Sequence, residues 1–248
     1  MLQDVIFERN VANLSGGGAS LVGSIVRGRV GFLDTRFVGN IAMRGGGIFA
    51  DSVSELDFRR TNVFHNNTAL SGGGMLVISQ NRMDNQIVMY NATFASNTAG
   101  ETLCYLNDVS FKKNAEDCEK IFEKFNHVGP SCSVGGGGAV CLLLDQLPDR
   151  SKAVVQIRDV HFSDNSGVVG GAVHIRVAGN EWTDVCPIVS VPVPRDSCRT
   201  VGLVDVEFSG NKAFNGTNAI FANDPSSVFI ARDAPSLGLP SFRSLEDV

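Results

Sequence analysis

The sequence predicts an all-β protein in which the chain coils into a parallel β-solenoid. The first observation is a repeated phrase, Phe-x-x-Asn, and the second is a run of glycines that follows most of its copies. The third is spacing: successive phrases from Phe7 to Phe94 lie 30, 27 and 30 residues apart, which is too short for a crossover helix in every unit. Seven copies occur, at Phe7/Asn10, Phe37/Asn40, Phe64/Asn67, Phe94/Asn97, Phe111/Asn114, Phe162/Asn165 and Phe208/Asn211.

Each unit contains two short strands and a glycine-rich corner. The residues before each Phe alternate between apolar and polar, as in 204–208 (VDVEF), which is the period of a half-buried strand. A second apolar run follows the glycines, as in 75–78 (MLVI). In a solenoid the repeats stack like on like, so we expect an aromatic column of Phe side chains, a ladder of Asn amides, and glycine corners with positive φ.

Two insertions interrupt the repeat. We expect one β-helix domain over residues 1–233, with insertions at about 115–134 and 177–199, and a poorly ordered tail at 234–248. In the first insertion Cys118, Ile121, Phe122 and Phe125 have helical spacing, which predicts a short amphipathic helix with Asn114 as N-cap. The second insertion carries two cysteines, three prolines and the only tryptophan, and is predicted to be a loop.

Cysteines and glycosylation motifs indicate an oxidising, secretory route. The six cysteines are Cys104, Cys118, Cys132, Cys141, Cys186 and Cys198, and the four Asn-x-Ser/Thr motifs begin at Asn13, Asn66, Asn91 and Asn215. We predict the pairs Cys104–Cys141, Cys118–Cys132 and Cys186–Cys198, one of fifteen possible connectivities. The first residues do not form a signal peptide, so we expect the chain to be part of a larger protein.

Composition excludes some partners. A formal net charge of −5 and a pI near 5.4 argue against nucleic acid, and the longest apolar run, 139–144, cannot span a bilayer.

The repeat resembles that of the polymorphic outer membrane protein family, whose signatures are Phe-x-x-Asn and Gly-Gly-Ala-Ile. The best fits are Phe162 to Asn165 with 170–173 (GGAV), and Phe37 to Asn40 with 46–48 (GGI). This resemblance implies a right-handed parallel β-helix at a cell surface, with a role in adhesion, and it lends no catalytic residues. The chain departs from the bacterial pattern in its cysteines and glycosylation motifs, and looks more like related repeats of eukaryotic surface or secreted proteins.

One repeat position is rich in aspartate. Five aspartates stand three residues before the Phe, in register with Asn91 and Thr61: Asp4, Asp34, Asp108, Asp159 and Asp205, of which Asp34, Asp159 and Asp205 are the calcium candidates. A stacked acidic column could bind Ca²⁺ through oxygen ligands. The favoured interpretation is that each Asp serves its local turn, because the position belongs to every repeat and not to one site. The histidines show no metal-binding spacing, and we interpret His161 and His174 as outward-facing strand residues.

Two functions are consistent with the sequence. The first is a non-enzymatic extracellular or cell-surface scaffold that binds a cell-surface protein or a carbohydrate, with no cofactor apart from possible calcium. The second is a pectate-lyase-like or glycoside hydrolase enzyme on the same fold. An enzyme should show a non-repeating cluster of charged residues on one face, and the sequence alone reveals only aspartates that belong to the repeat.

Overall fold

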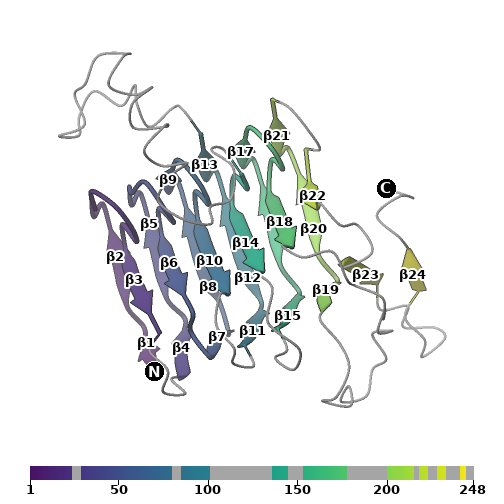
Figure 1. Cartoon of the computed structure of the whole chain (residues 1–248), viewed down its shortest axis with the longest axis horizontal. Helices are drawn as coiled ribbons and strands as arrows, with labels where there is room; N and C mark the ends of the chain where they lie inside the picture. Colours follow the sequence, from purple (N-terminus) through teal and green to yellow (C-terminus); the bar gives the residue numbers. More distant parts are fainter. Residues whose placement is uncertain are drawn as a thin grey trace.

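The computed structural model describes residues 1–23, 29–79, 85–100, 136–144, 153–177, 200–214, 218–222, 228–232 and 241–243. This described part is all-β: it contains strands, bridges and turns, and no helix. The strands form sheets of eight, six, six and four strands, here named A, B, D and C (Figure 1).

Sheet A is the longest wall. Its strands, in spatial order, are β1 (Leu2–Gln3), β4 (Arg29–Leu33), β7 (Glu55–Arg59), β11 (Asn85–Tyr90), β15 (Ala153–Arg158), β19 (Thr200–Val204), β23 (Val228–Arg232) and β24 (Ser241–Arg243). Sheet B carries the repeated Phe and consists of β2 (Ile6–Glu8), β5 (Arg36–Val38), β8 (Asn62–His65), β12 (Ala92–Ala95), β16 (His161–Ser163) and β20 (Glu207–Ser209).

The two remaining sheets follow the Asn turn. Sheet C is made of the short strands β9 (Thr68–Ala69), β13 (Thr98–Ala99), β17 (Ser166–Gly167) and β21 (Lys212–Ala213). Sheet D follows the glycine corner and contains β3 (Ala19–Val22), β6 (Ile48–Asp51), β10 (Met75–Ser79), β14 (Val140–Leu144), β18 (Val173–Val177) and β22 (Ile220–Ala222).

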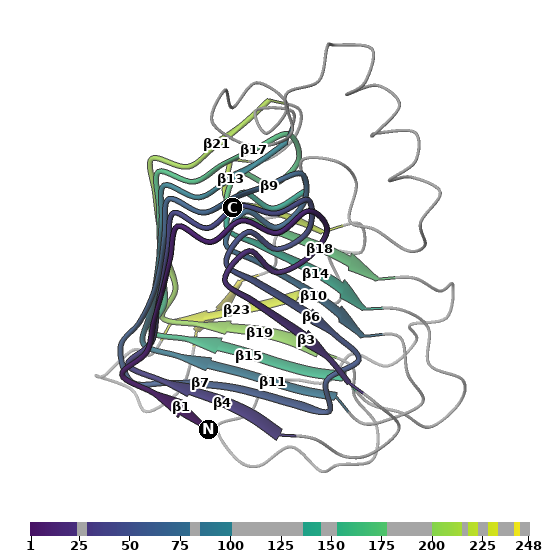
Figure 2. The same cartoon turned by 90° about the vertical axis from the view of Figure 1, so that its left-hand side faces the viewer.

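The chain passes through sheets A, B, C and D in turn and then begins the next coil, so strands one coil apart pair in parallel. Register follows the repeat: Phe37 pairs with Phe64, and Phe64 with Phe94. The exception among the described strands is β24, which pairs antiparallel with β23. Figure 2 shows strands of successive coils lying over one another. Parallel strands in stacked sheets confirm the predicted all-β class and are compatible with a parallel β-helix or solenoid.

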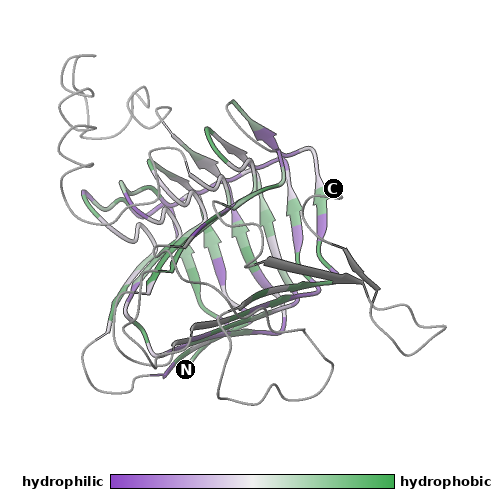
Figure 3. Ribbon diagram, turned by 45° about the vertical axis from the view of Figure 1, so that its right-hand side comes forward, coloured by the Kyte–Doolittle hydropathy of each residue, from purple (hydrophilic) through white to green (hydrophobic). Residues whose placement is uncertain are grey.

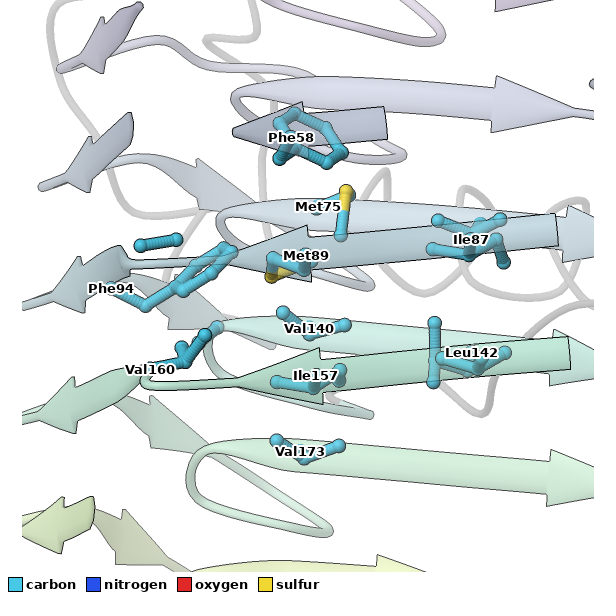
Figure 4. Close-up of a cluster of buried hydrophobic side chains, with 14 of the residues drawn as sticks. Phe58, Met75, Ile87, Met89, Phe94, Val140, Leu142, Ile157, Val160 and Val173 are labelled. Atoms are coloured by element: carbon cyan, nitrogen blue, oxygen red, sulfur yellow. The ribbon is translucent and has the colours of Figure 1, made fainter. Parts of the chain in front are cut away.

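The core fills the inside of the coils. Alternation along each strand sends every second side chain inward, where residues such as Phe58, Met75 and Ile157 are fully buried (Figure 4). Apolar residues recur at the same place in successive coils (Figure 3). Burial stabilises the fold by roughly 2 kcal/mol for each large side chain, so the core makes the main favourable contribution to the free energy of folding.

Two sequence predictions need correction. The ring of Phe94 stacks directly on that of Phe162, and Asn97 donates a hydrogen bond directly to Asn165. There is no place between these two coils for Phe111 and Asn114. The stack and the ladder therefore pass directly from the coil of Phe94 to the coil of Phe162, and the described coils number six.

The second correction concerns the corner between β7 and β8. The sequence places Thr61 in the aspartate column, but the residue that shares the positive φ of Asp34 and Asp159 at this corner is Arg60, at 61°. Phe64 follows Phe58 by six positions, whereas Phe37 follows Phe32 by five, so Thr61 is an extra residue that the corner accommodates.

Several expectations fall outside the described residues. The helix expected in 115–134 lies there entirely, and so does the loop at 177–199 apart from Val177, which ends β18. Within the tail expected to be poorly ordered, Ser241–Arg243 forms β24.

Candidate functional site

The repeated aromatic residues form a continuous stack. Rings of Phe7, Phe37, Phe64, Phe94, Phe162 and Phe208 lie face to face, with centroid distances of 4.4 to 5.2 Å between neighbours. Phe32 and Phe58 form a second stacked pair at 5.0 Å, edge-on to the first stack. Stacking at these distances adds roughly 1 kcal/mol per pair beyond burial, so these residues are engaged in the fold.

The repeated asparagines form a hydrogen-bonded ladder. In each inner coil the Oδ1 atom accepts from the backbone N–H and from the Nδ2 of the preceding Asn, as Asn97 does from Asn67, both at 3.0 Å. Each Nδ2 also donates to the carbonyl of the Phe in the preceding coil, as Asn97 does to Phe64 at 3.0 Å. The ladder runs through Asn10, Asn40, Asn67, Asn97, Asn165 and Asn211. The amides of the inner coils, Asn40, Asn67, Asn97 and Asn165, are fully used within the ladder, so none of these four is left to bind a ligand.

The aspartate column occupies the corner between sheets A and B. Asp34, Asp159 and Asp205 have φ values of 50°, 53° and 51°, a left-handed conformation that Asp and Asn tolerate better than other residues with a side chain. Asp34 accepts from the backbone N–H of Thr61 at 3.2 Å and from Arg60 at 3.3 Å, which are contacts within the stacked corners. Backbone conformation therefore accounts for aspartate at this position.

A calcium site needs several oxygen ligands that converge on one point. Arg60 and Asn91 stand between Asp34 and Asp159 in the column, because they occupy the same corner in the intervening coils. Within the described ranges, no group of three or more His, Cys, Asp or Glu side chains is placed to hold a metal ion.

Sequence reasoning missed one charged cluster, on the outer face of sheet A. The carboxylate of Asp57 is only 2% exposed, and it accepts from Arg29 at 2.8 Å and from Arg59 at 2.8 and 3.0 Å. Glu55 pairs with Arg29 at 3.0 Å, so the four charges cancel. These bonds raise the pKa of the Arg29 guanidinium, chiefly through the hydrogen bond to Asp57 and then through Glu55.

The signal for this cluster was present but weak. Asp57 lies between Leu56 and Phe58, which both belong to the core, and Arg29 comes one coil earlier in the register-paired strand. Unlike the aspartate column, the cluster does not recur: the positions of Asp57 in the neighbouring coils are Gly31 and Val88.

The described histidines differ in environment. His65 and His161 are exposed on the outer face of sheet B, and His161 Nδ1 lies 2.9 Å from Glu207. His174 is also on the outer side of its strand, in sheet D, but it is 4% exposed and its Nδ1 has no hydrogen-bond partner. Burial, and then the positive charge of Arg176, lower the pKa of His174 to about 4.

Two observations bear on the secretory prediction. Cys141 is disulfide-bonded, and the other five cysteines lie outside the described residues, so the predicted pairing is still a prediction. Asn13, Asn66 and Asn91 are exposed, and Asn215 lies outside the described residues.

Comparison with known proteins gives no match to the chain among family models, curated proteins or solved structures. In the part of the chain that the structure describes, no helix has the length and apolar character needed to cross a membrane.

Proposed function

We propose that this chain is a non-enzymatic extracellular or cell-surface protein, built as a right-handed parallel β-helix, that presents its outer faces to a cell-surface protein or a carbohydrate. The observation that carries the proposal is that the recurring residues stabilise the fold itself. The Phe rings stack, the Asn amides hydrogen-bond to one another, and the Asp residues occupy corners that need a left-handed backbone conformation. Recurrence therefore reflects construction of a scaffold and not a repeated chemical site.

The disulfide at Cys141 and the exposed glycosylation motifs at Asn66 and Asn91 support an extracellular setting. Binding would then fall to surfaces that vary between coils. Sheet A offers the broadest such surface, because its outer face carries exposed Arg59, Gln156 and Arg158 with the half-buried Tyr90 beside them. Arg and Tyr are the residue types that most often anchor protein interfaces.

The test is to express the chain with a secretion signal and measure its binding to glycan arrays and to intact cells. We expect saturable binding that is reduced at least several-fold in the double variant Arg59→Ala/Arg158→Ala. A matched double variant on sheet B, Arg36→Ala/His65→Ala, should retain binding. Equal binding by all three proteins would reject sheet A as the surface, and absence of saturable binding would reject the function.

One observation favours the second candidate, a carbohydrate-active enzyme. The cluster of Arg29, Glu55, Asp57 and Arg59 is the kind of non-repeating charged group that an enzyme on this fold requires. Its carboxylate is already held by two guanidinium groups, which leaves it poorly placed to accept a proton from a substrate.

Incubation with polyuronides decides between the two. A lyase would release unsaturated products that absorb in the ultraviolet, and a hydrolase would release new reducing ends. We expect neither from the wild-type chain; activity that disappears in Asp57→Asn would establish the enzyme.

A further inference from the structure

Three exposed asparagines, Asn13, Asn66 and Asn91, have side-chain amides that the fold does not use. Within the described part of the chain these amides make no hydrogen bond. Every other asparagine whose side chain the structure describes donates or accepts through its amide: Asn10, Asn40, Asn62, Asn67, Asn97, Asn165, Asn211 and Asn218. Modification of a free amide would therefore break no hydrogen bond of the fold.

The same three asparagines each begin an Asn-x-Ser/Thr motif, which Ser15, Thr68 and Thr93 complete. None of the hydrogen-bonded asparagines begins such a motif. In the ladder the residue two positions later is alanine or glycine, as Ala69 is for Asn67. The acceptor motif for N-linked glycosylation thus coincides with the amides that the fold leaves free and exposed.

The conformation of the corners does not by itself account for these motifs. Asn66 and Asn91 have φ values of 54° and 51°, which asparagine tolerates. Aspartate holds the same two corners in a later coil, at Asp164 and Asp159, with φ values of 54° and 53°. The turns therefore accept a residue that cannot carry an N-linked glycan, so they do not explain why an amide stands there with a hydroxyl residue two positions later.

Asn66 and Asn91 stand at opposite ends of two neighbouring strands of sheet B. Asn91 directly precedes β12 and Asn66 directly follows β8, and these two strands pair in register, with His65 opposite Ala95. Five residue steps separate the two corners along the strands, which is roughly 16 Å at 3.3 Å per step. Glycans on both asparagines would border the outer face of sheet B from two sides, because a glycan is bulky and projects from the surface.

We propose that Asn13, Asn66 and Asn91 carry N-linked glycans, and that those on Asn66 and Asn91 shield the outer face of sheet B between them. The inference rests on the proposed extracellular function, because the glycan is attached on the secretory route. Its consequence is that an external partner of the glycosylated chain is directed away from this part of sheet B, which agrees with binding on sheet A.

The attachment is a group transfer without oxidation. The Nδ2 atom of the asparagine loses one proton and forms a bond to the anomeric carbon of an oligosaccharide. The bond from that carbon to a phosphate oxygen of a lipid diphosphate donor breaks, and the lipid diphosphate leaves with the electron pair.

The first test is to express the full chain with a secretion signal in eukaryotic cells and to treat it with a peptide N-glycosidase, which converts each glycosylated asparagine to aspartate. Peptide mass spectrometry should find this conversion at Asn13, Asn66 and Asn91, and none at the ladder residue Asn40. An absence of conversion at any of the three would overturn the assignment of that site. Conversion in a chain that shows no saturable binding to glycan arrays or cells would reject the proposed function and leave this inference standing.

The second test measures access to sheet B. In His65→Lys, an amine replaces an exposed side chain and the motif at Asn66 is kept. We expect a large amine-reactive polymer to label residue 65 several-fold faster after deglycosylation, and equally fast when Asn66→Asp and Asn91→Asp remove both glycans. The control is Arg176→Lys, at an exposed position on sheet D, where labelling should be the same with and without glycans. Equal labelling of residue 65 in the glycosylated and deglycosylated chains would contradict the shielding.

Discussion

Asn40 donates two hydrogen bonds to the Oδ1 atom of Asn67, one from its backbone N–H and one from its Nδ2, both at 3.0 Å. The Nδ2 of Asn67 in turn donates to Phe37 and to Asn97. Both Asn40 and Asn67 are fully buried, so each amide is satisfied only by its neighbours in the stack. This dependence makes the middle of the ladder sensitive to any substitution that removes an amide donor.

We predict that Asn67→Asp destabilises the chain by about 3 to 5 kcal/mol. A carboxylate cannot donate, so the Phe37 carbonyl would lose the Nδ2 donor, Asn97 Oδ1 would keep only the backbone N–H of residue 67, and both would face a buried negative charge. The matched control is the same change one residue earlier, Asn66→Asp, because Asn66 is exposed and Asp also tolerates its φ of 54°. Urea unfolding of unglycosylated protein measures both, and similar midpoints would refute the ladder's role.

The glycine corner gives a second prediction. Gly45 has a φ of 58°, and a Cβ added there would stand 2.0 Å from the Ile48 carbonyl oxygen. Gly39 has a similar φ of 63°, but its Cβ would meet only the Arg9 side chain, at 3.6 Å. We expect Gly39→Ala to destabilise the folded chain by about 1 kcal/mol, because of the positive φ alone. Gly45→Ala should destabilise it by on the order of 3 kcal/mol, because the backbone must also move to make room for the Cβ.

Thermal unfolding of the two alanine variants separates the cost of the positive φ from the steric cost of the added Cβ. Equal losses of stability would mean that positive φ alone explains the glycine runs. A larger loss at Gly45 assigns the excess to the close approach of its own turn.

The extent to which the sequence predicted these features follows from how the fold is stabilised. Phe37 and Asn40 were identifiable because stacking requires the same residue at the same place in every coil. Asp57 was not, since its partner Arg29 is defined by register across the sheet, and a one-residue difference in corner length would change that partner. Phe111 and Asn114 show the converse: the phrase occurs once more between Asn97 and Phe162, yet the aromatic stack passes directly from Phe94 to Phe162.

The aspartate corner can be tested without assuming calcium. At Asp159, with φ 53°, we expect Asp159→Asn to change stability by less than about 0.5 kcal/mol, because Asn also adopts this conformation. Asp159→Val should cost about 2 kcal/mol, because a β-branched side chain is strained there. We also expect a calcium chelator to leave the melting temperature of the wild-type chain unchanged. A drop on chelation that Asp159→Asn abolishes would instead establish a calcium site.

His174 gives the chain a predictable pH dependence. Its pKa falls from about 6.5 to about 4 in the folded state because burial, and then the charge of Arg176, disfavour the protonated ring. Between these two values the unfolded chain binds a proton that the folded chain does not, so the free energy of unfolding decreases as the pH falls from 6.5 to 4 and levels off below 4. The fall of the His174 pKa from 6.5 to about 4 corresponds to a loss of at most about 3 to 4 kcal/mol of unfolding free energy.

Replacing the ring isolates this contribution. In His174→Leu the unfolded and folded chains no longer differ in protonation at this position, so urea unfolding at a series of pH values should show a shallower decline between pH 6.5 and 4. The control is His65→Leu, because His65 is exposed on sheet B and its loss should leave the slope unchanged. If His174→Leu retained the full slope, the acid sensitivity would have to come from other groups, and the buried ring on the outer side of sheet D would not be its source.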